Sequence, residues 1–130
     1  MNSRILIADD DSGLRQLMRL ILAREGFDVI EAANGEQTLA LAMVVDPALI
    51  LLDVMMPDMD GYDVCRRLKA DQRTGRVPVV FVSAAEGVAL RNEALKLGAD
   101  ACIKKPIGPR DLVERVRAVL AGVENRAPCA

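Results

Sequence analysis

Short, dense runs of aliphatic residues alternate along this chain with longer segments whose apolar residues recur at helical spacing. Four dense runs and one more amphipathic segment are the expected strands, and they cover residues 5–8, 27–31, 49–52, 79–82 and 101–103. Continuous apolar runs of this length are typical of parallel strands that are covered on both faces. The alternation therefore predicts an α/β fold, an open parallel sheet with helices on both sides.

Five helices are expected between and after these strands. In the first, apolar residues at i, i+3, i+4, i+7 and i+8 line one face; they are Leu14, Leu17, Met18, Ile21 and Leu22. Ser12 is its expected N-cap and Gly26 its C-terminal stop. The other helices are expected over residues 34–45, 61–70, 88–97 and from residue 109 onward. We expect one domain over residues 1–121, and residues 122–130 as a C-terminal tail or the start of a linker.

Composition excludes several classes of function. The formal net charge of −2 argues against direct nucleic-acid binding, which usually requires a basic surface. No stretch approaches the roughly 18 apolar residues of a membrane span, and the N-terminus lacks the pattern of a signal peptide, so a cytoplasmic protein is expected. The chain has no histidine, which removes Ser-His and Cys-His catalysis. Its three cysteines are widely spaced and odd in number, so a disulfide framework or a zinc site is not expected.

Polar residues follow four of the expected strands at the point where each ends. The acidic run 9–11 follows the first strand, Asp53 follows the third, Ser83 ends the fourth, and Lys105 closes the fifth. The carboxyl ends of parallel strands meet at one edge of the sheet, where open α/β folds bind their ligands. If the first and third strands are neighbours, the acids converge on one pocket, although the spacing alone does not establish the strand order.

Such a pocket suits phosphoryl chemistry with a metal ion. Clustered carboxylates raise one another's pKa values, and Mg²⁺ relieves the repulsion because it prefers oxygen ligands. A serine hydroxyl and a lysine ammonium beside the metal could clamp the oxygens of a phosphoryl group, and an aspartate can act as the nucleophile toward phosphorus. Simpler interpretations stay open for each part: the acidic run could cap the first helix, Asp53 could be a turn residue, and Ser83 and Lys105 could be ordinary edge and surface residues.

Taken together, these segments resemble a response-regulator receiver domain. The resemblance covers roughly residues 4–120, and its motifs lie at 5–11, 51–61, 78–84 and 97–106. It implies a flavodoxin-like, doubly wound sheet of five parallel strands in the order 2-1-3-4-5, with five helices.

The resemblance also implies a metal site. Asp53 matches the phosphoacceptor and a metal ligand, and Asp10 the direct Mg²⁺ ligand. Asp9 matches the acid that usually holds the metal through water, and Met55 the residue whose backbone carbonyl binds it. No organic cofactor is implied. Met55 and Ala85 are expected to flank the path of an attacking water without positioning it, so self-dephosphorylation should be slow or unremarkable.

Two further positions match residues that respond to the phosphoryl group. Ser83 matches the hydroxyl that moves toward it, and Lys105 the lysine that forms a salt bridge with it, preceding a Lys105–Pro106 bond that is usually cis in the family. The family usually has an aromatic residue three before the lysine, where this chain has Cys102. We expect Cys102 to be a core residue rather than a redox group, and aromatic-coupled switching to be weakened or replaced.

The function implied is a phosphorylation-dependent signalling switch. A partner histidine kinase or histidine phosphotransferase would donate the phosphoryl group to Asp53 in a Mg²⁺-dependent reaction. The fourth helix, fifth strand and fifth helix would then repack to present a changed face to an unknown downstream effector, a face expected to include Arg91, Lys96, Lys104 and Arg110. The first helix would help dock the kinase, unless its apolar residues are simply core. The chain would catalyse only its own phosphorylation and dephosphorylation.

Three alternative functions fit the sequence less well. A Mg²⁺-dependent phosphatase with an aspartyl nucleophile would place a second acid two residues after Asp53, where the chain has Met55. A flavin-binding protein would need a loop rich in Ser, Thr and Gly after the first strand, where this chain has acids. A degenerate receiver that acts only as a binding module would not need the complete acidic set with Ser83 and Lys105.

Overall fold

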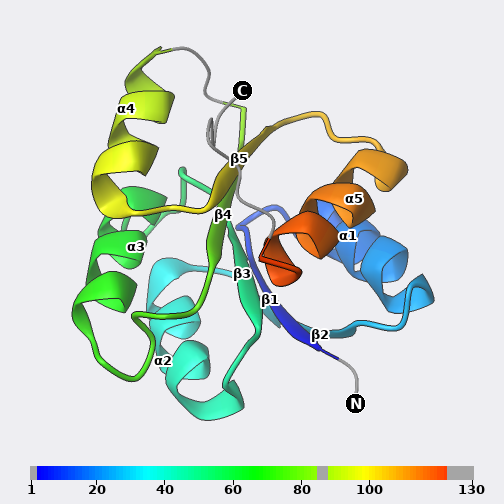
Figure 1. Cartoon of the computed structure of the whole chain (residues 1–130), viewed down its shortest axis with the longest axis horizontal. Coiled ribbons are helices and arrows are strands. Elements are labelled where there is room, and N and C mark those ends of the chain that lie inside the picture. The colour runs from blue at the N-terminus through cyan, green and yellow to red at the C-terminus, as the bar shows by residue number, and fades with distance from the viewer. Residues whose placement is uncertain (1–2, 85–87, 123–130) are drawn as a thin grey trace.

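The computed structural model describes residues 3–84 and 88–122, and the expected alternation of strands and helices runs through them (Figure 1). The strands are β1 (Arg4–Ala8), β2 (Asp28–Ala32), β3 (Leu49–Leu52), β4 (Val79–Ser83) and β5 (Ala101–Lys104). The helices are α1 (Ser12–Arg24), α2 (Gly35–Val45), α3 (Gly61–Ala70), α4 (Val88–Leu97) and α5 (Pro109–Leu120). All strands pair in parallel in the order β2-β1-β3-β4-β5, which confirms the predicted fold class.

The sheet is the middle of three layers. Helices α2, α3 and α4 cover one face, and α1 and α5 cover the other (Figure 1). Successive residues of a strand point to opposite faces, so Ile5 and Ile7 enter the core beneath α1 and α5, whereas Leu6 and Ala8 enter the core beneath α2 and α3. Every residue of β3 is at most 1% exposed. This two-sided burial explains why the strands are continuous apolar runs rather than alternating ones.

Local capping sets where the helices begin. Asp11, and not Ser12 as predicted, is the N-cap of α1: its carboxylate accepts a hydrogen bond from the backbone N–H of Leu14 at 3.2 Å. Asn34 caps α2 as predicted, through the N–H of Gln37 at 2.8 Å. The longest of these helices has 13 residues. No helix in the described part of the chain combines the length and apolar character that crossing a membrane requires.

Hydrogen bonds of the sheet continue one residue past the ends of the strands. The N–H of Asp53 donates to the carbonyl of Ala8 at 2.9 Å, and the N–H of Asp9 donates to the carbonyl of Ala32 at 3.2 Å. On the other side, the N–H of Lys105 donates to the carbonyl of Ser83 at 2.9 Å. The residues that follow the strands are therefore held level with one another along a single edge of the sheet.

Gly61, the first residue of α3, packs directly against the backbone that carries Asp53. A Cβ atom at this position would lie 2.2 Å from the carbonyl oxygen of Asp53 and 2.9 Å from the Cα of Val54. The N–H of Gly61 also donates to the carbonyl of Val54 at 2.6 Å. Any side chain here would push α3 away from the end of β3.

We therefore expect Gly61→Ala to lower the free energy of unfolding by about 1–3 kcal/mol, the usual range for forcing atoms into a packed site. Urea denaturation would measure this change. Gly108→Ala is the control, because a Cβ there meets nothing within 4 Å, and its effect should stay below about 1 kcal/mol. Equal stability of the two variants would show that α3 does not depend on the close approach at Gly61.

Candidate functional site

Three aspartates gather at the edge of the sheet where β1 and β3 end. One carboxylate oxygen from each of Asp9, Asp10 and Asp53 lies within 4.8 Å of the others. Asp9 is 1% exposed and Asp53 is 5% exposed, whereas Asp10 faces solvent. The group is open on the side of Asp10 and offers only oxygen donors, the ligands that Mg²⁺ prefers. Its chemistry therefore fits a hard divalent cation.

Lys105 places one positive charge against two of these acids. Its Nζ atom lies 2.9 Å from Oδ2 of Asp9 and 3.4 Å from Oδ1 of Asp53. Burial alone would lower the pKa of Lys105, but its hydrogen bond to Asp9 and the charge of Asp53 raise that pKa above its ordinary value. The lysine is thus held as a cation between the acids. The Lys105–Pro106 peptide bond is cis, as the resemblance implies.

Asp53 has an unusual affinity for protons. Burial, and then the negative charge of Asp9, raise the pKa of Asp53 from its ordinary 3.8 to about 6, against the opposing charge of Lys105. The sequence correctly suggests repulsion among the acids, but it does not reveal that burial is the larger cause. Burial and the charge of Asp9 destabilise the ionised form of Asp53. A bound cation would therefore stabilise this carboxylate more than it would stabilise an exposed one.

Ser83 and Met55 also lie at this edge. Ser83 ends β4 and is 1% exposed, opposite Lys104 of β5 in the sheet register. The backbone N–H of Met55 lies 3.4 Å from Oδ1 of Asp53, and the Met55 side chain is turned to solvent, 72% exposed. Asp9, Asp10, Met55 and Lys105 are neighbours of Asp53, and Ser83 ends the adjacent strand; Ala85 lies outside the described residues.

Cys102 is buried in β5, within the core beneath α2 and α3, which agrees with its predicted place. Its sulfur is disulfide-bonded, which the wide spacing of the three cysteines did not predict. Cys65 is a free, buried thiol, and burial raises its pKa to about 11. Arg115 of α5 donates from Nη2 to the backbone carbonyl of Cys102 at 2.8 Å.

Asp58 has a structural role that no local sequence pattern indicates. Its two carboxylate oxygens accept hydrogen bonds from the N–H groups of Gly35 and Glu36, each at 2.8 Å. These bonds hold the pKa of Asp58 below its ordinary value. They tie the loop after Asp53 to the first turn of α2. The partners lie more than 20 residues apart in the chain, so no local pattern could have revealed the contact.

The raised pKa of Asp53 predicts a pH-dependent gain in stability for Asp53→Asn in the absence of divalent cations. Between pH 3.8 and about 6 the folded protein retains a proton on Asp53 that the unfolded chain has lost. Ionisation of Asp53 therefore costs stability as the pH rises through this window. The amide cannot ionise, so the stability of the variant relative to wild type should grow by about 1–3 kcal/mol between pH 4 and pH 7.

Chemical denaturation across that pH range would measure the difference. Asp46→Asn, at an exposed position outside the site, controls for the loss of one negative charge. A difference between Asp53→Asn and wild type that did not change with pH would contradict the raised pKa.

Comparison with known proteins agrees with this geometry. Residues 5–117 match the family model of the response regulator receiver domain. The transcriptional regulatory protein SrrA of Staphylococcus aureus (strain NCTC 8325 / PS 47) is 41% identical over 125 residues, which cover 96% of this chain and 51% of the relative. The probable transcriptional regulator ycf27 of Cyanophora paradoxa is 38% identical over 94% of this chain and 50% of the relative. The chain spans about half the length of the curated relatives it matches.

Solved structures give the same result. A putative response regulator from Chloroflexus aurantiacus superposes with a TM-score of 0.88 at 30% identity, over 93% of this chain and 99% of that one. A CheY-like response regulator receiver domain protein from Methanospirillum hungatei also has a TM-score of 0.88, at 31% identity over 95% and 97% of the two chains. By its sequence, its strand order and its group of acids, the chain belongs to the family of response regulator receiver domains.

Proposed function

We propose that this chain is a phosphorylation-dependent signalling switch that accepts a phosphoryl group on Asp53. The observation that carries the proposal is the environment of Asp53: a buried carboxylate with two acids on one side and the Lys105 ammonium 3.4 Å away. Such a group is poised for a reaction that spreads negative charge over new oxygens and needs cations to balance it. Membership of the receiver family supports the same assignment.

Magnesium is the cation that the donor set favours. Asp10, Asp53 and the backbone carbonyl of Met55 would bind it directly, and Asp9 would hold it through water. When bound, Mg²⁺ would neutralise the carboxylates and the oxygens of the incoming phosphoryl group. The exposure of Asp10 leaves an open side through which the ion and its waters can enter.

The side chains of the protein carry out the rest of the reaction. An oxygen of the Asp53 carboxylate forms a bond to phosphorus while the phosphorus–nitrogen bond to the partner's histidine breaks. The imidazole keeps the electron pair and takes a proton from solvent. Lys105, which contacts Asp53 in the free protein, then binds an oxygen of the phosphoryl group, and the Ser83 hydroxyl donates to another. The chain turns over no separate substrate and acts only on its own phosphorylation state.

The output would be a change at the face formed by α4, β5 and α5. Ser83 pairs with Lys104 in the sheet, so movement at the end of β4 bears directly on β5. Arg115 links α5 to the same strand through the Cys102 carbonyl. Lys104 and Arg110 are exposed in this region, whereas the side chain of Arg91 lies outside the described residues. Cys102 stands where the family usually has an aromatic ring. We infer that the contacts of β5 with β4 and with α5 transmit the effect of phosphorylation instead.

The donor would dock on a groove between α1 and α5. Met18 of α1 is core, 1% exposed, but Leu17 and Leu20 are 51% and 61% exposed. The two leucines and Val113 of α5 give apolar walls to a groove of about 690 Å³ with a rim of charged residues. Both helices begin at the sheet edge that carries Asp53. A helical kinase or phosphotransferase lying there would bring its histidine toward that carboxylate.

Neither principal alternative has comparable support. A phosphatase of the aspartyl-nucleophile type needs a second acid two residues after Asp53, and the side chain at that position is an exposed methionine. A degenerate receiver that served only as a binding module would have no use for three converging acids with a lysine held between two of them.

The proposed function predicts a Mg²⁺-dependent adduct on Asp53. On incubation with acetyl phosphate, intact mass spectrometry should detect one phosphoryl group on the wild-type protein with Mg²⁺, and none when the metal is chelated. Asp53→Asn should form no adduct, whereas Asp111→Asn, on the exposed surface of α5, should react as the wild type does. An adduct that persists in Asp53→Asn, or that needs no metal, would disprove the assignment.

The docking groove predicts a selective effect on the protein donor. Leu17→Ser combined with Leu20→Ser should slow phosphotransfer from a histidine kinase that phosphorylates the wild type by at least about tenfold, because burying even one leucine contributes about 1.5–3 kcal/mol. Phosphorylation by acetyl phosphate should not change. Val44→Ser removes an 80% exposed apolar side chain from α2, on the other face of the sheet, and serves as control. Equal slowing by both variants would rule out the groove as the docking site.

A further inference from the structure

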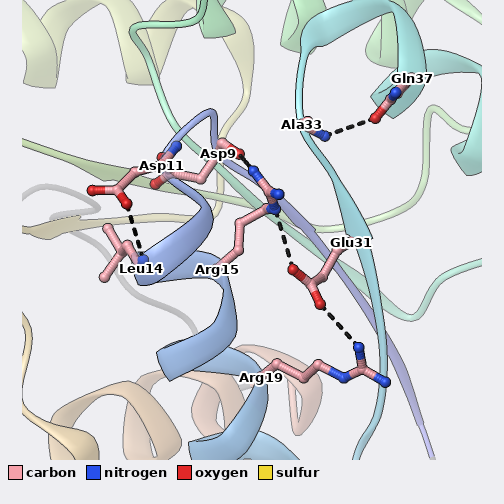
Figure 2. A network of polar contacts seen from close by, with 8 residues as sticks. All are labelled: Asp9, Asp11, Leu14, Arg15, Arg19, Glu31, Ala33 and Gln37. Atoms are coloured by element: carbon pink, nitrogen blue, oxygen red, sulfur yellow. Dashed lines mark hydrogen bonds and ion pairs between the residues drawn. The ribbon is translucent and has the colours of Figure 1, made fainter.

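Arg15 of α1 reaches back to the loop that carries the acids. Its Nη1 atom donates a hydrogen bond to the backbone carbonyl of Asp9 at 2.7 Å, and its Nε atom donates to Oε1 of Glu31 at 3.1 Å (Figure 2). The Arg15 side chain is 15% exposed, so this fork of the guanidinium is largely shielded from water. Charge-assisted hydrogen bonds of this kind are among the stronger ones in proteins.

Every polar group of Asp9 takes part in a hydrogen bond. Its N–H donates to the Ala32 carbonyl at 3.2 Å and its carbonyl accepts from Arg15 at 2.7 Å. Its two carboxylate oxygens accept from the N–H of Asp11 and from Nζ of Lys105, each at 2.9 Å. Asp9 is therefore fixed by four separate contacts, and Arg15 supplies the one to the carbonyl.

The orientation of the Asp10 side chain, by contrast, depends on the backbone that carries it. Among the described residues, no hydrogen bond or ion pair reaches the Asp10 carboxylate. The carbonyl of Asp9 and the N–H of Asp10 belong to one planar peptide unit. Anchoring that carbonyl sets the plane of the unit, and with it the direction in which the Asp10 side chain leaves the chain.

Glu31 helps to orient the guanidinium of Arg15. Its second carboxylate oxygen accepts from Nη1 of Arg19 at 3.0 Å, so a single carboxylate from β2 lies between two arginines of α1 (Figure 2). Arg19 is 57% exposed and contacts Glu31, whereas Arg15 contacts both Glu31 and Asp9. The two arginines share a helix and a partner and differ in their contact with the acidic loop.

We propose that Arg15 is a positioning residue for the metal site: it orients the Asp9–Asp10 peptide so that the Asp10 carboxylate is directed at the cation. Glu31 acts one step further out, because it orients Arg15. This inference rests on the proposed magnesium site. Supporting residues that orient metal ligands typically change metal affinity by about 10–100-fold when they are removed.

A titration of the metal-free protein with MgCl₂, followed by NMR, would test the proposal. Arg15→Met should weaken Mg²⁺ binding by about tenfold or more, while Arg19→Met should stay within about twofold of wild type. Glu31→Ala should weaken binding less than Arg15→Met does. Without any metal, the backbone amides of Asp10 and Asp11 should exchange with solvent faster in Arg15→Met than in Arg19→Met.

The outcomes separate this inference from the proposed function. A wild-type protein that binds no Mg²⁺, or binds it equally well as Asp10→Asn, would overturn the metal site and this inference with it. Wild-type binding that depends on Asp10, with Arg15→Met no weaker than Arg19→Met, would overturn the role of Arg15 alone. If Arg15→Met does not fold, Glu31→Ala decides, and unchanged affinity with unchanged amide exchange in that variant would overturn the role.

Discussion

The ammonium group of Lys105 between two buried carboxylates is the contact on which the edge of the sheet depends. Asp9 and Asp53 are both nearly inaccessible to water, and two anions held so close together would be strongly unfavourable without it. Among the described residues, the ion pairs of these three acids involve one ammonium, so negative charge is in excess there. The excess negative charge that destabilises the free protein is also what favours a cation at this edge of the sheet.

Other contacts in the fold keep the ammonium and the two carboxylates in position. Hydrogen bonds that continue past the strand ends keep Asp9, Asp53 and Lys105 level. The strands are buried on both faces, so they cannot slide by one residue without turning their aliphatic side chains out of one core and into the other. Outer contacts then fix the loops: Asp58 fastens the loop after β3, and Arg15 fastens the loop after β1.

The features that the sequence predicted are those that depend on residues close together in the chain. The dense aliphatic runs located the strands, and the placement of Asp9, Asp53 and Lys105 directly after three of them predicted the site. The order of the strands came from the family resemblance, because spacing does not determine which strands are neighbours. The contacts of Asp58 with α2 and of Arg15 with Glu31 could not be anticipated, since they join segments that only the finished fold brings together.

The salt bridge between Lys105 and Asp9 also has a consequence for how the site comes into being. It joins residues 96 positions apart, and so encloses most of the chain. During synthesis the acids of β1 and β3 emerge well before β5 can supply the ammonium, and a chain cut before β5 would never acquire it. The ammonium therefore reaches the acids only once β5 has joined the sheet. A donor that recognises the assembled edge would, by that fact alone, distinguish whole receivers from nascent or truncated ones.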